Sequence, residues 1–490
     1  MYRKTFAWLR AVGIILALTV VLTGFGLALE PGGSPAHPEI PSLAELLQGF
    51  DNGTYDLRDF RQMGLSVFTT PFNTLDGFGD GPFDPSEVDT LAFGQRPSLQ
   101  GNGLLLRVNG LDAQSCNECH TIVSHATRPP TLGIGGVGGA VNNAIIMPDL
   151  IDTVDDPQFG FDGTAEFTGR FANPPFLFGG GGVEMLAKEM TANLQALLAQ
   201  ARQAPAGTVI QLDTHGTHFG EVTSLGNGDV DLAAEGLGPE DTHGVAEEEV
   251  LVVRPFGRKG ENFSMRDFDR GAMQFHFGIQ PVEVVGADID GDGDGLTNEI
   301  TIAEMSMLHI FDVTNPVPVR ASQGGAGQGG ETLFHSTGCA SCHHPEKATN
   351  SRHLPLATPE VATDPSQNVY FEIDLKKVGF RQAPNGGVRV PLFSDLKRHK
   401  MGPRLAESFT GGEIANDEFI TARLWGIADT APYLHDGRAT TLYQAIEFHG
   451  GEAQAVRDQF LNLSAQQQQE LIDFLKTLRA PDRPNEDLID

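Results

Sequence analysis

The four cysteines of the 490-residue chain all lie in two copies of one short motif. The motifs are Cys-Asn-Glu-Cys-His at 116–120 and Cys-Ala-Ser-Cys-His at 339–343. Two thiols at this spacing can form thioether bonds to the two vinyl groups of one porphyrin, and the adjacent histidine then supplies a nitrogen ligand to the iron. The spacing predicts two c-type haems. Their attachment residues and iron ligands would be Cys116, Cys119, His120, Cys339, Cys342 and His343.

A Cys-x-x-Cys pair can also be a redox-active dithiol or half of a zinc site. Both alternatives are disfavoured, because the chain holds two complete motifs and no further cysteine. With both haems attached, no thiol remains for a disulfide or for dithiol chemistry. The cofactor prediction is therefore two covalently attached haem c groups.

The second iron ligand of each haem decides what that haem can do. A haem that only carries electrons usually has two protein ligands, whereas peroxide or dioxygen chemistry needs an open or displaceable sixth position. Met401, in a Met-Gly-Pro loop after the second motif, is the candidate for that haem; the alternative is a methionine that only fills the core. For the first haem four histidines compete, each with a surface or core role as the alternative: His125, His215, His218 and His276.

A glycine-rich segment supplies a candidate acid–base group. Four glycines at 179–182 allow the backbone to approach a flat, bulky group, and they run into a predicted helix at 183–203 that carries Glu184 near its start. Peroxide cleavage needs a base that moves a proton between the two oxygens, and a carboxylate beside an apolar haem face can do this. The alternative is a glutamate placed there only for the helix dipole.

An acidic stretch at 288–299 has the alternating oxygen side chains and glycines of a calcium loop. A register that starts at Asp288 places a glutamate at the twelfth position. A register that starts at Asp290 places Asn298 at the ninth position and Thr301 at the twelfth. Both registers stay open, as does a solvated acidic turn. The predicted calcium ligands are Asp288, Asp290, Asp292, Asp294 and Glu299.

Residues 1–28 have the features of a secretory signal: Arg3, Lys4 and Arg10, then an apolar run, then Gly26-x-Ala28 as a small-residue cleavage site. The alternative is an uncleaved anchor, because the uncharged run from 11 to 29 is long enough to span a bilayer. Either way we expect a periplasmic protein, anchored to the membrane only if the signal is retained.

The chain is strongly acidic, with 33 Lys+Arg against 64 Asp+Glu and a formal net charge of −31. A nucleic-acid partner is excluded, because binding to phosphates needs a basic surface. A small basic redox protein is the expected electron donor, since opposite charge speeds the encounter.

The length predicts two or three domains. We expect an N-terminal haem domain at 29–312 with a small β-rich insert near 205–258, a linker at 313–330 and a C-terminal domain at 331–490. Two prolines and a glycine-rich run mark the linker. Ser464 and Gln467 predict a capping box at the start of the last helix, and residues 208–212 predict a strand in the insert.

Taken in order, these segments resemble the bacterial di-haem cytochrome c peroxidase superfamily, and within it the di-haem oxidoreductase branch. The resemblance covers most of residues 61–480, and its most specific part is the tail. The segments that carry it are 72–79, both haem motifs, 182–185, 266–268, the acidic loop, 401–403, 424–426, 431–442 and 449–453.

The resemblance implies a mainly α fold of two cytochrome c-like haem domains with long loops and a small β-rich insert. It implies an electron-transfer haem with histidine and methionine ligands, matching His343 and Met401, and a peroxide-reacting haem on His120. Glu184 matches the family's catalytic acid–base glutamate, and calcium between the domains is also a family feature. Trp425 would lie near the route between the haems or in the core, and His435 and Arg438 would hold haem propionates or the interdomain turn.

Three functions follow from these features. The first is a peroxidase that takes electrons at the second haem and reduces hydrogen peroxide, or another small oxidant, at the first. The second is an oxygenase or protein-modifying oxidase on the same scaffold. The third is a di-haem electron carrier without catalysis. A high-spin component in the spectrum would exclude the third.

Overall fold

The computed structural model of the protein describes residues 35–78, 114–120, 122, 145–152, 166–239, 242–291, 293–322, 325–407 and 414–488. The predicted signal at 1–28 lies outside these residues, as do His125 and Asp292. The structure contains 36% helix and 16% strand. The prediction of a mainly α fold therefore holds only in part, because short strands occur along the chain and not only in the insert.

Helix α8 (Ile302–Val313) forms the centre of the N-terminal half, since each of its residues from Ala303 onward is buried. Helix α3 (Leu57–Thr69) packs closely against it at Gly64. A Cβ atom on Gly64 would lie 2.1 Å from the carbonyl oxygen of Met307. Glycine is therefore needed here for the close approach of two backbones. The apolar interior of this half surrounds α8.

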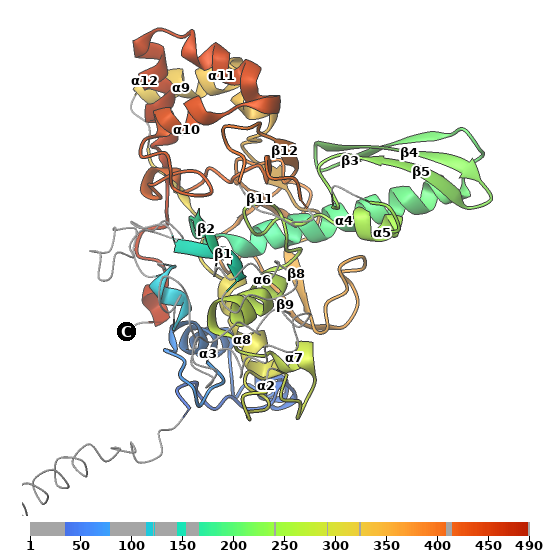
Figure 1. Ribbon diagram of the computed structural model, residues 1–490, viewed down its shortest axis with the longest axis vertical. Coiled ribbons are helices and arrows are strands. Elements are labelled where there is room, and N and C mark those ends of the chain that lie inside the picture. Colours follow the sequence, from blue (N-terminus) through green and yellow to red (C-terminus); the bar gives the residue numbers. More distant parts are fainter. Residues whose placement is uncertain are drawn as a thin grey trace, which may run out of the picture.

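Helix α4 (Gly180–Gln203) crosses the molecule in Figure 1 and begins three residues before the predicted helix. Its glycines allow close packing. A Cβ on Gly181 would lie 2.3 Å from the carbonyl oxygen of Val313, and one on Gly182 would lie 2.4 Å from the ring of Phe380. The helix thus contacts both the end of α8 and a segment after the second haem motif. Its next side chains, including Glu184, are fully enclosed.

The predicted β-rich insert contains an antiparallel sheet of β3 (Val209–Thr214), β4 (Thr217–Gly226) and β5 (Asp229–Ala234). The strand predicted at 208–212 is confirmed within one residue at its start. Figure 1 shows this sheet projecting from the molecule alongside the C-terminal half of α4, on which it packs. The base of the sheet contacts the C-terminal region, because Lys397 Nζ donates to Glu235 at 2.8 Å.

The C-terminal region has a helical cluster of α9 (Gly325–Ser336), α10 (Leu442–Phe448), α11 (Gln454–Leu461) and α12 (Ala465–Leu475). It forms the upper part of the molecule in Figure 1. The capping box of Ser464 and Gln467 is confirmed. Helix α9 begins inside the segment predicted as a linker.

The glycines of this former linker serve helix packing. A Cβ on Gly330 would lie 2.0 Å from the carbonyl oxygen of Glu470, on α12. The two helices can therefore approach closely only with glycine at this position. This packing could not be predicted, because the sequence does not show which backbone lies against a glycine-rich run.

Buried apolar residues form two large clusters. The larger one surrounds α8 and includes residues 354–392 from the C-terminal region, together with Trp425. The smaller one holds the haem-motif helix α9 against α12, with Phe334, Phe460 and Phe474 at its centre. The chain therefore returns to the first half after the second haem motif. The domain boundaries drawn from the sequence stay a prediction.

The remaining elements are short. No helix of the described residues is long and apolar enough to cross a membrane. The other helices are α2 (Leu43–Asp51), α5 (Glu247–Val250), α6 (Met265–Ala272) and α7 (Val282–Val285). The other strands are β1 (Ile145–Asp152), β2 (Glu166–Ala172), β6 (Val319–Arg320), β7 (Lys347–Ala348), β8 (His353–Ala357), β9 (Val369–Asp374), β10 (Arg381–Gln382), β11 (Val388–Val390), β12 (Arg398–Lys400), β13 (Glu418–Ile420) and β14 (Leu478–Arg479).

Candidate haem sites

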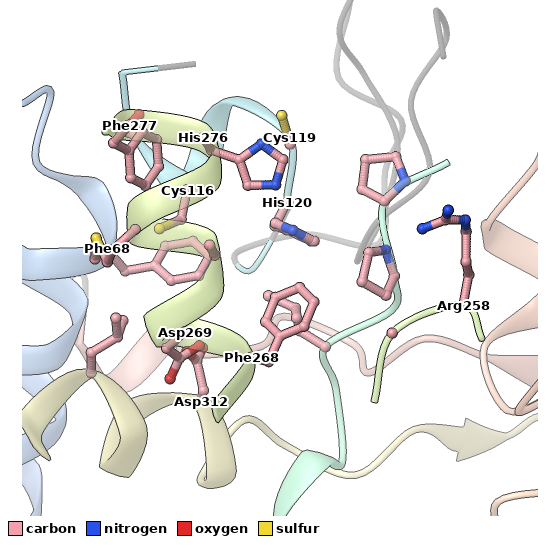
Figure 2. A pocket seen from close by; sticks show the side chains of 18 of the residues that line it. Phe68, Cys116, Cys119, His120, Arg258, Phe268, Asp269, His276, Phe277 and Asp312 are labelled. Carbon is pink, nitrogen blue, oxygen red and sulfur yellow. The ribbon is translucent and has the colours of Figure 1, made fainter. Parts of the chain in front are cut away.

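The first motif opens onto a cavity between α3, α6, α8 and the extended segment before α4 (Figure 2). Its two cysteines lie on a 3-10 turn that begins at Cys116, and the amide of His120 donates to the Cys116 carbonyl at 2.9 Å. This turn brings all three motif side chains to one wall. The other walls are mainly apolar and include Phe68, Pro174, Pro175, Leu177, Phe268, Met273, Phe277 and Leu308.

These residues fit a covalently attached porphyrin. Cys116, Cys119 and His120 all line the same apolar cavity, as the attachment chemistry requires. Burial, and then the charge of His276, lower the pKa of His120 to about 4, while the carbonyl of Pro175 opposes this shift. His120 is therefore neutral at physiological pH, which is the form that binds iron.

His276 is the predicted sixth-ligand candidate that the structure brings to this cavity. Figure 2 shows its ring close to that of His120. It lies in a π-helical turn, η3 (Met273–Phe277), and such turns are frequent at functional sites. The other two described candidates are engaged elsewhere: His215 contacts Glu189 at 2.9 Å, and His218 contacts Asp213 at 2.8 Å.

Two carboxyl groups that the sequence reasoning did not single out line the same cavity. They belong to Asp269 on α6 and Asp312 at the end of α8. Burial raises the pKa of both groups, that of Asp312 to about 8. An aspartate near the end of the apolar segment 302–313 was a usable signal, because burying a carboxyl group without a hydrogen-bond partner costs free energy.

Glu184 lies behind this wall and is not among the described residues that line the cavity. Its carboxylate is fully buried and is contacted by Lys188 Nζ at 2.7 Å and His309 Nε2 at 3.1 Å. It also accepts the amide of Met265 at 2.9 Å. Burial raises the pKa of Glu184, but Lys188 and His309 outweigh this and hold it well below its usual range. Its catalytic role stays a prediction.

The second motif is arranged differently. Nδ1 of His343 donates to the carbonyl of Phe393 at 3.1 Å, so its Nε2 is the basic nitrogen that can bind iron. The ring of His449 lies nearby, with 6.4 Å between the two ring centres and 54° between the ring planes. Nδ1 of His449 donates to the carbonyl of Ala445 at 2.9 Å, which likewise leaves Nε2 as the basic nitrogen.

This spacing suits an iron between two imidazoles. A metal–nitrogen bond of about 2 Å on each side, with about 1 Å from each nitrogen to its ring centre, gives about 6 Å. Burial, and then the charge of His449, lower the pKa of His343 to about 4, and burial also lowers the pKa of His449. Both rings are therefore neutral, as ligands must be.

Met401, the ligand predicted from the sequence, lies beside this pair. It is half-buried, and a Cβ on Gly450 would lie 2.9 Å from its carbonyl oxygen. The loop with Met401 and the turn with His449 are therefore neighbours. In the sequence analysis, His449 fell in a segment that carries the resemblance but was given no role; the available signal was a histidine followed by two glycines.

The predicted calcium ligands come together only in part. Asp288 pairs with Asn298 at 2.9 Å, and Asp290 accepts the amides of Gly293 and Gly295. Glu299 instead points into the protein, where it accepts the amide of Gln280 at 2.8 Å. Both registers of the calcium loop therefore stay a prediction.

The tail residues have structural contacts. Arg438 donates to Asp436 and to the carbonyl of Arg404, which fits the predicted turn. His435 stacks on Phe419 at 4.4 Å. Trp425 is buried in the larger apolar cluster, where a Cβ on Gly179 would lie 2.6 Å from its ring.

The chain was compared with known protein families, curated proteins and solved structures. Residues 306–478 match the family described as "Di-haem oxidoreductase, putative peroxidase". The family implies two haems, with which the two cysteine motifs agree. No curated protein matches the chain.

Two solved structures are similar over part of the chain. One is hydrazine synthase of Kuenenia stuttgartiensis, at 17% identity and a TM-score of 0.25, covering 61% of this chain and 91% of that chain. The other is a MauG-like protein associated with microbial copper homeostasis, at 17% identity and a TM-score of 0.27, covering 61% of this chain and 87% of that chain.

Proposed function

We propose that this protein is a member of the di-haem oxidoreductase family that reduces hydrogen peroxide to water with electrons from a small redox protein. The observation that carries the proposal is the difference between its two haem sites. The first motif faces a cavity, whereas the second motif presents a histidine with another histidine nearby. An open site suits a reaction at the iron, and a site closed by two ligands suits electron transfer.

Each haem would be held by its own motif. Cys116, Cys119 and His120 would hold the first, and Cys339, Cys342 and His343 the second. When bound, the haems supply reversible one-electron chemistry at iron and, at the first site, a position for the oxidant. We infer that His449 is the second ligand at the second site, since its Nε2 is basic and correctly spaced; Met401 is the alternative.

His276 would then be a displaceable ligand of the first site. Its π-helical turn can revert to an α-helical turn, and such a change would withdraw the imidazole from the cavity. With His276 withdrawn, the cavity at the first site would offer a position for the oxidant that the second site lacks. The reaction consumes one hydrogen peroxide, two electrons and two protons and yields two waters, so the first site also needs a proton source.

The cellular setting and partners follow from the sequence. An exported protein of net charge −31 would meet its electron donor in the periplasm, and a basic donor would approach it fastest. The protein would be anchored to the membrane only if residues 1–28 are retained. Calcium at Asp290 and its neighbours remains part of the proposal, through the register that does not need Glu299.

The test is peroxide-dependent oxidation of a reduced small cytochrome by the purified di-haem protein. We expect rapid oxidation that requires peroxide. Binding of dioxygen by the reduced protein without any reaction with peroxide would favour an oxygenase instead. If both haems were inert to peroxide and carbon monoxide, the protein would be an electron carrier.

The role of Glu184 is tested in the same assay. If it is the acid–base group, Glu184→Gln lowers turnover per attached haem by roughly 100-fold or more. Glu189→Gln is the matched control, because Glu189 lies on the same helix but contacts His215 and the amides of Asn350 and Ser351 instead. Normal turnover in Glu184→Gln would remove the assigned role.

A further inference from the structure

Two buried carboxyl groups meet on the wall of the first haem cavity. Asp269, on α6, is 6% exposed, and Asp312, on α8, is 2% exposed. They hydrogen-bond to each other. Figure 2 shows them together to the left of Phe268, on the wall of the cavity that the haem motif faces. The second oxygen of Asp269, Oδ2, is buried and has no hydrogen-bond partner among the described residues.

A pair of this kind retains a proton. Two carboxylates in contact cannot both be ionised in a buried site, because burial and mutual repulsion oppose the second charge. Glu184 on α4 adds further negative charge near Asp269, and Arg266 on α6 opposes it. The charge of Arg266 is itself shared with Glu283, at 2.6 Å.

The other titratable groups of the cavity are Cys116, Cys119, His120, Arg258 and His276. His120 is neutral, for the reason given above, and the Cys116 sulfur would be a neutral thioether once a haem is attached. His276 lies close to His120, and Arg258 is paired with Glu407 at 2.6 Å. The carboxyl pair therefore lowers its charge by holding a proton.

Glu184 makes the contrast. Its charge is matched by Lys188 and His309, so it has no need of a proton. Among the described residues the carboxyl pair forms no ion pair, and it faces the cavity directly. Compared with Glu184, the Asp269–Asp312 pair is therefore the site that has a proton to exchange with the cavity.

We propose that the Asp269–Asp312 pair is the proton-exchanging group of the first haem cavity, and that Asp269 Oδ2 is the atom through which the proton enters it. Where the pair holds a single proton, one electron that reaches this haem is matched by a second proton that the pair takes up, so the net charge of the buried cavity stays constant. This inference rests on the proposed function only in placing a haem in the cavity.

The test is the reduction potential of the di-haem protein as a function of pH, measured by spectroelectrochemistry without peroxide. In the wild type, one of the two waves should fall by about 59 mV per pH unit where the pair titrates, the value for one proton per electron. In Asp269→Asn and Asp312→Asn this slope should be lost. The matched control is Asp267→Asn, on the same helix but outside the cavity, which should keep it.

A slope equal to that of the wild type in both cavity variants would overturn the proposal, as would two pH-independent waves in the wild type. If the variants do not fold, the infrared difference spectrum of the reduced and oxidised wild type decides. A carboxylic acid C=O band that changes on reduction and shifts in D2O would support the proposal, and its absence would overturn it. Because no peroxide is present, a failed peroxidase assay leaves this result unaffected.

Discussion

The two haem sites share the same five-residue pattern but differ in how their histidines are held. At the second site, Nδ1 of His343 and of His449 both donate to backbone carbonyls, at 3.1 and 2.9 Å. At the first site, His120 Nδ1 is buried with no partner among the described residues. The cavity there also contains His276 on a π-helical turn and a protonated carboxyl pair.

This difference teaches that the motif attaches a haem without deciding its chemistry. Anchored imidazoles keep the second site in one geometry, which lowers the reorganisation that an electron transfer requires. The looser first site can exchange a ligand and a proton. The surroundings of each motif, and not the motif itself, therefore divide the work between the two sites.

The largest expected effect comes from breaking the closed site. His449→Ala should remove one ligand of the second haem, convert its spectrum from low-spin to high-spin and lower donor-dependent turnover by more than roughly 100-fold. Met401→Ala is the comparison, because the two residues are neighbours in the structure. Equal low-spin spectra for His449→Ala and wild type, with a high-spin second haem in Met401→Ala, would return the ligand role to the methionine.

The next largest effect is on stability. Glu184→Gln leaves the buried ammonium of Lys188 with one partner fewer and should lower the free energy of unfolding by about 3–5 kcal/mol. Urea unfolding of the haem-loaded protein measures this change. A loss below about 1 kcal/mol would show that the Glu184–Lys188 contact is not formed in the native protein.

The pH dependence of stability tests Asp312, which belongs to the first haem site only. Because the pKa of Asp312 is raised to about 8 in the folded protein, the folded state binds this proton more tightly than the unfolded chain does. Its contribution is fully present below the unfolded pKa of about 3.9 and is lost as pH rises through 8. Asp312→Asn should therefore flatten the decline in stability over this range, by at most about 1.4 kcal/mol per pH unit. Urea midpoints of both proteins against pH test this, and parallel curves would contradict it.

The smallest effect should come from the displaceable ligand. His276→Ala should increase the high-spin component of the first haem and speed cyanide binding, while turnover changes by no more than about threefold, because the ligand must leave in any case. This outcome is opposite to that of His449→Ala for the same substitution. A comparable collapse of turnover in both variants would erase the functional distinction between the sites.

Part of this account could be predicted from the sequence. The attachment residues, the strand of the insert and the capping box at Ser464 depend on local patterns, which can be recognised in a sequence. The role of the glycines at 181, 182 and 330 was not, since each is explained by the backbone or ring that lies against it. The carboxyl pair was missed for the same reason: Asp269 and Asp312 meet only because α6 packs on α8.

The spectrum of the resting and half-reduced holoprotein tests the central claim most directly. We predict one low-spin haem with two nitrogen ligands, which keeps its spectrum when peroxide or carbon monoxide is added, and one haem that becomes high-spin on half-reduction and reacts with both. Two low-spin haems that stay inert to peroxide and carbon monoxide in every redox state would contradict the account.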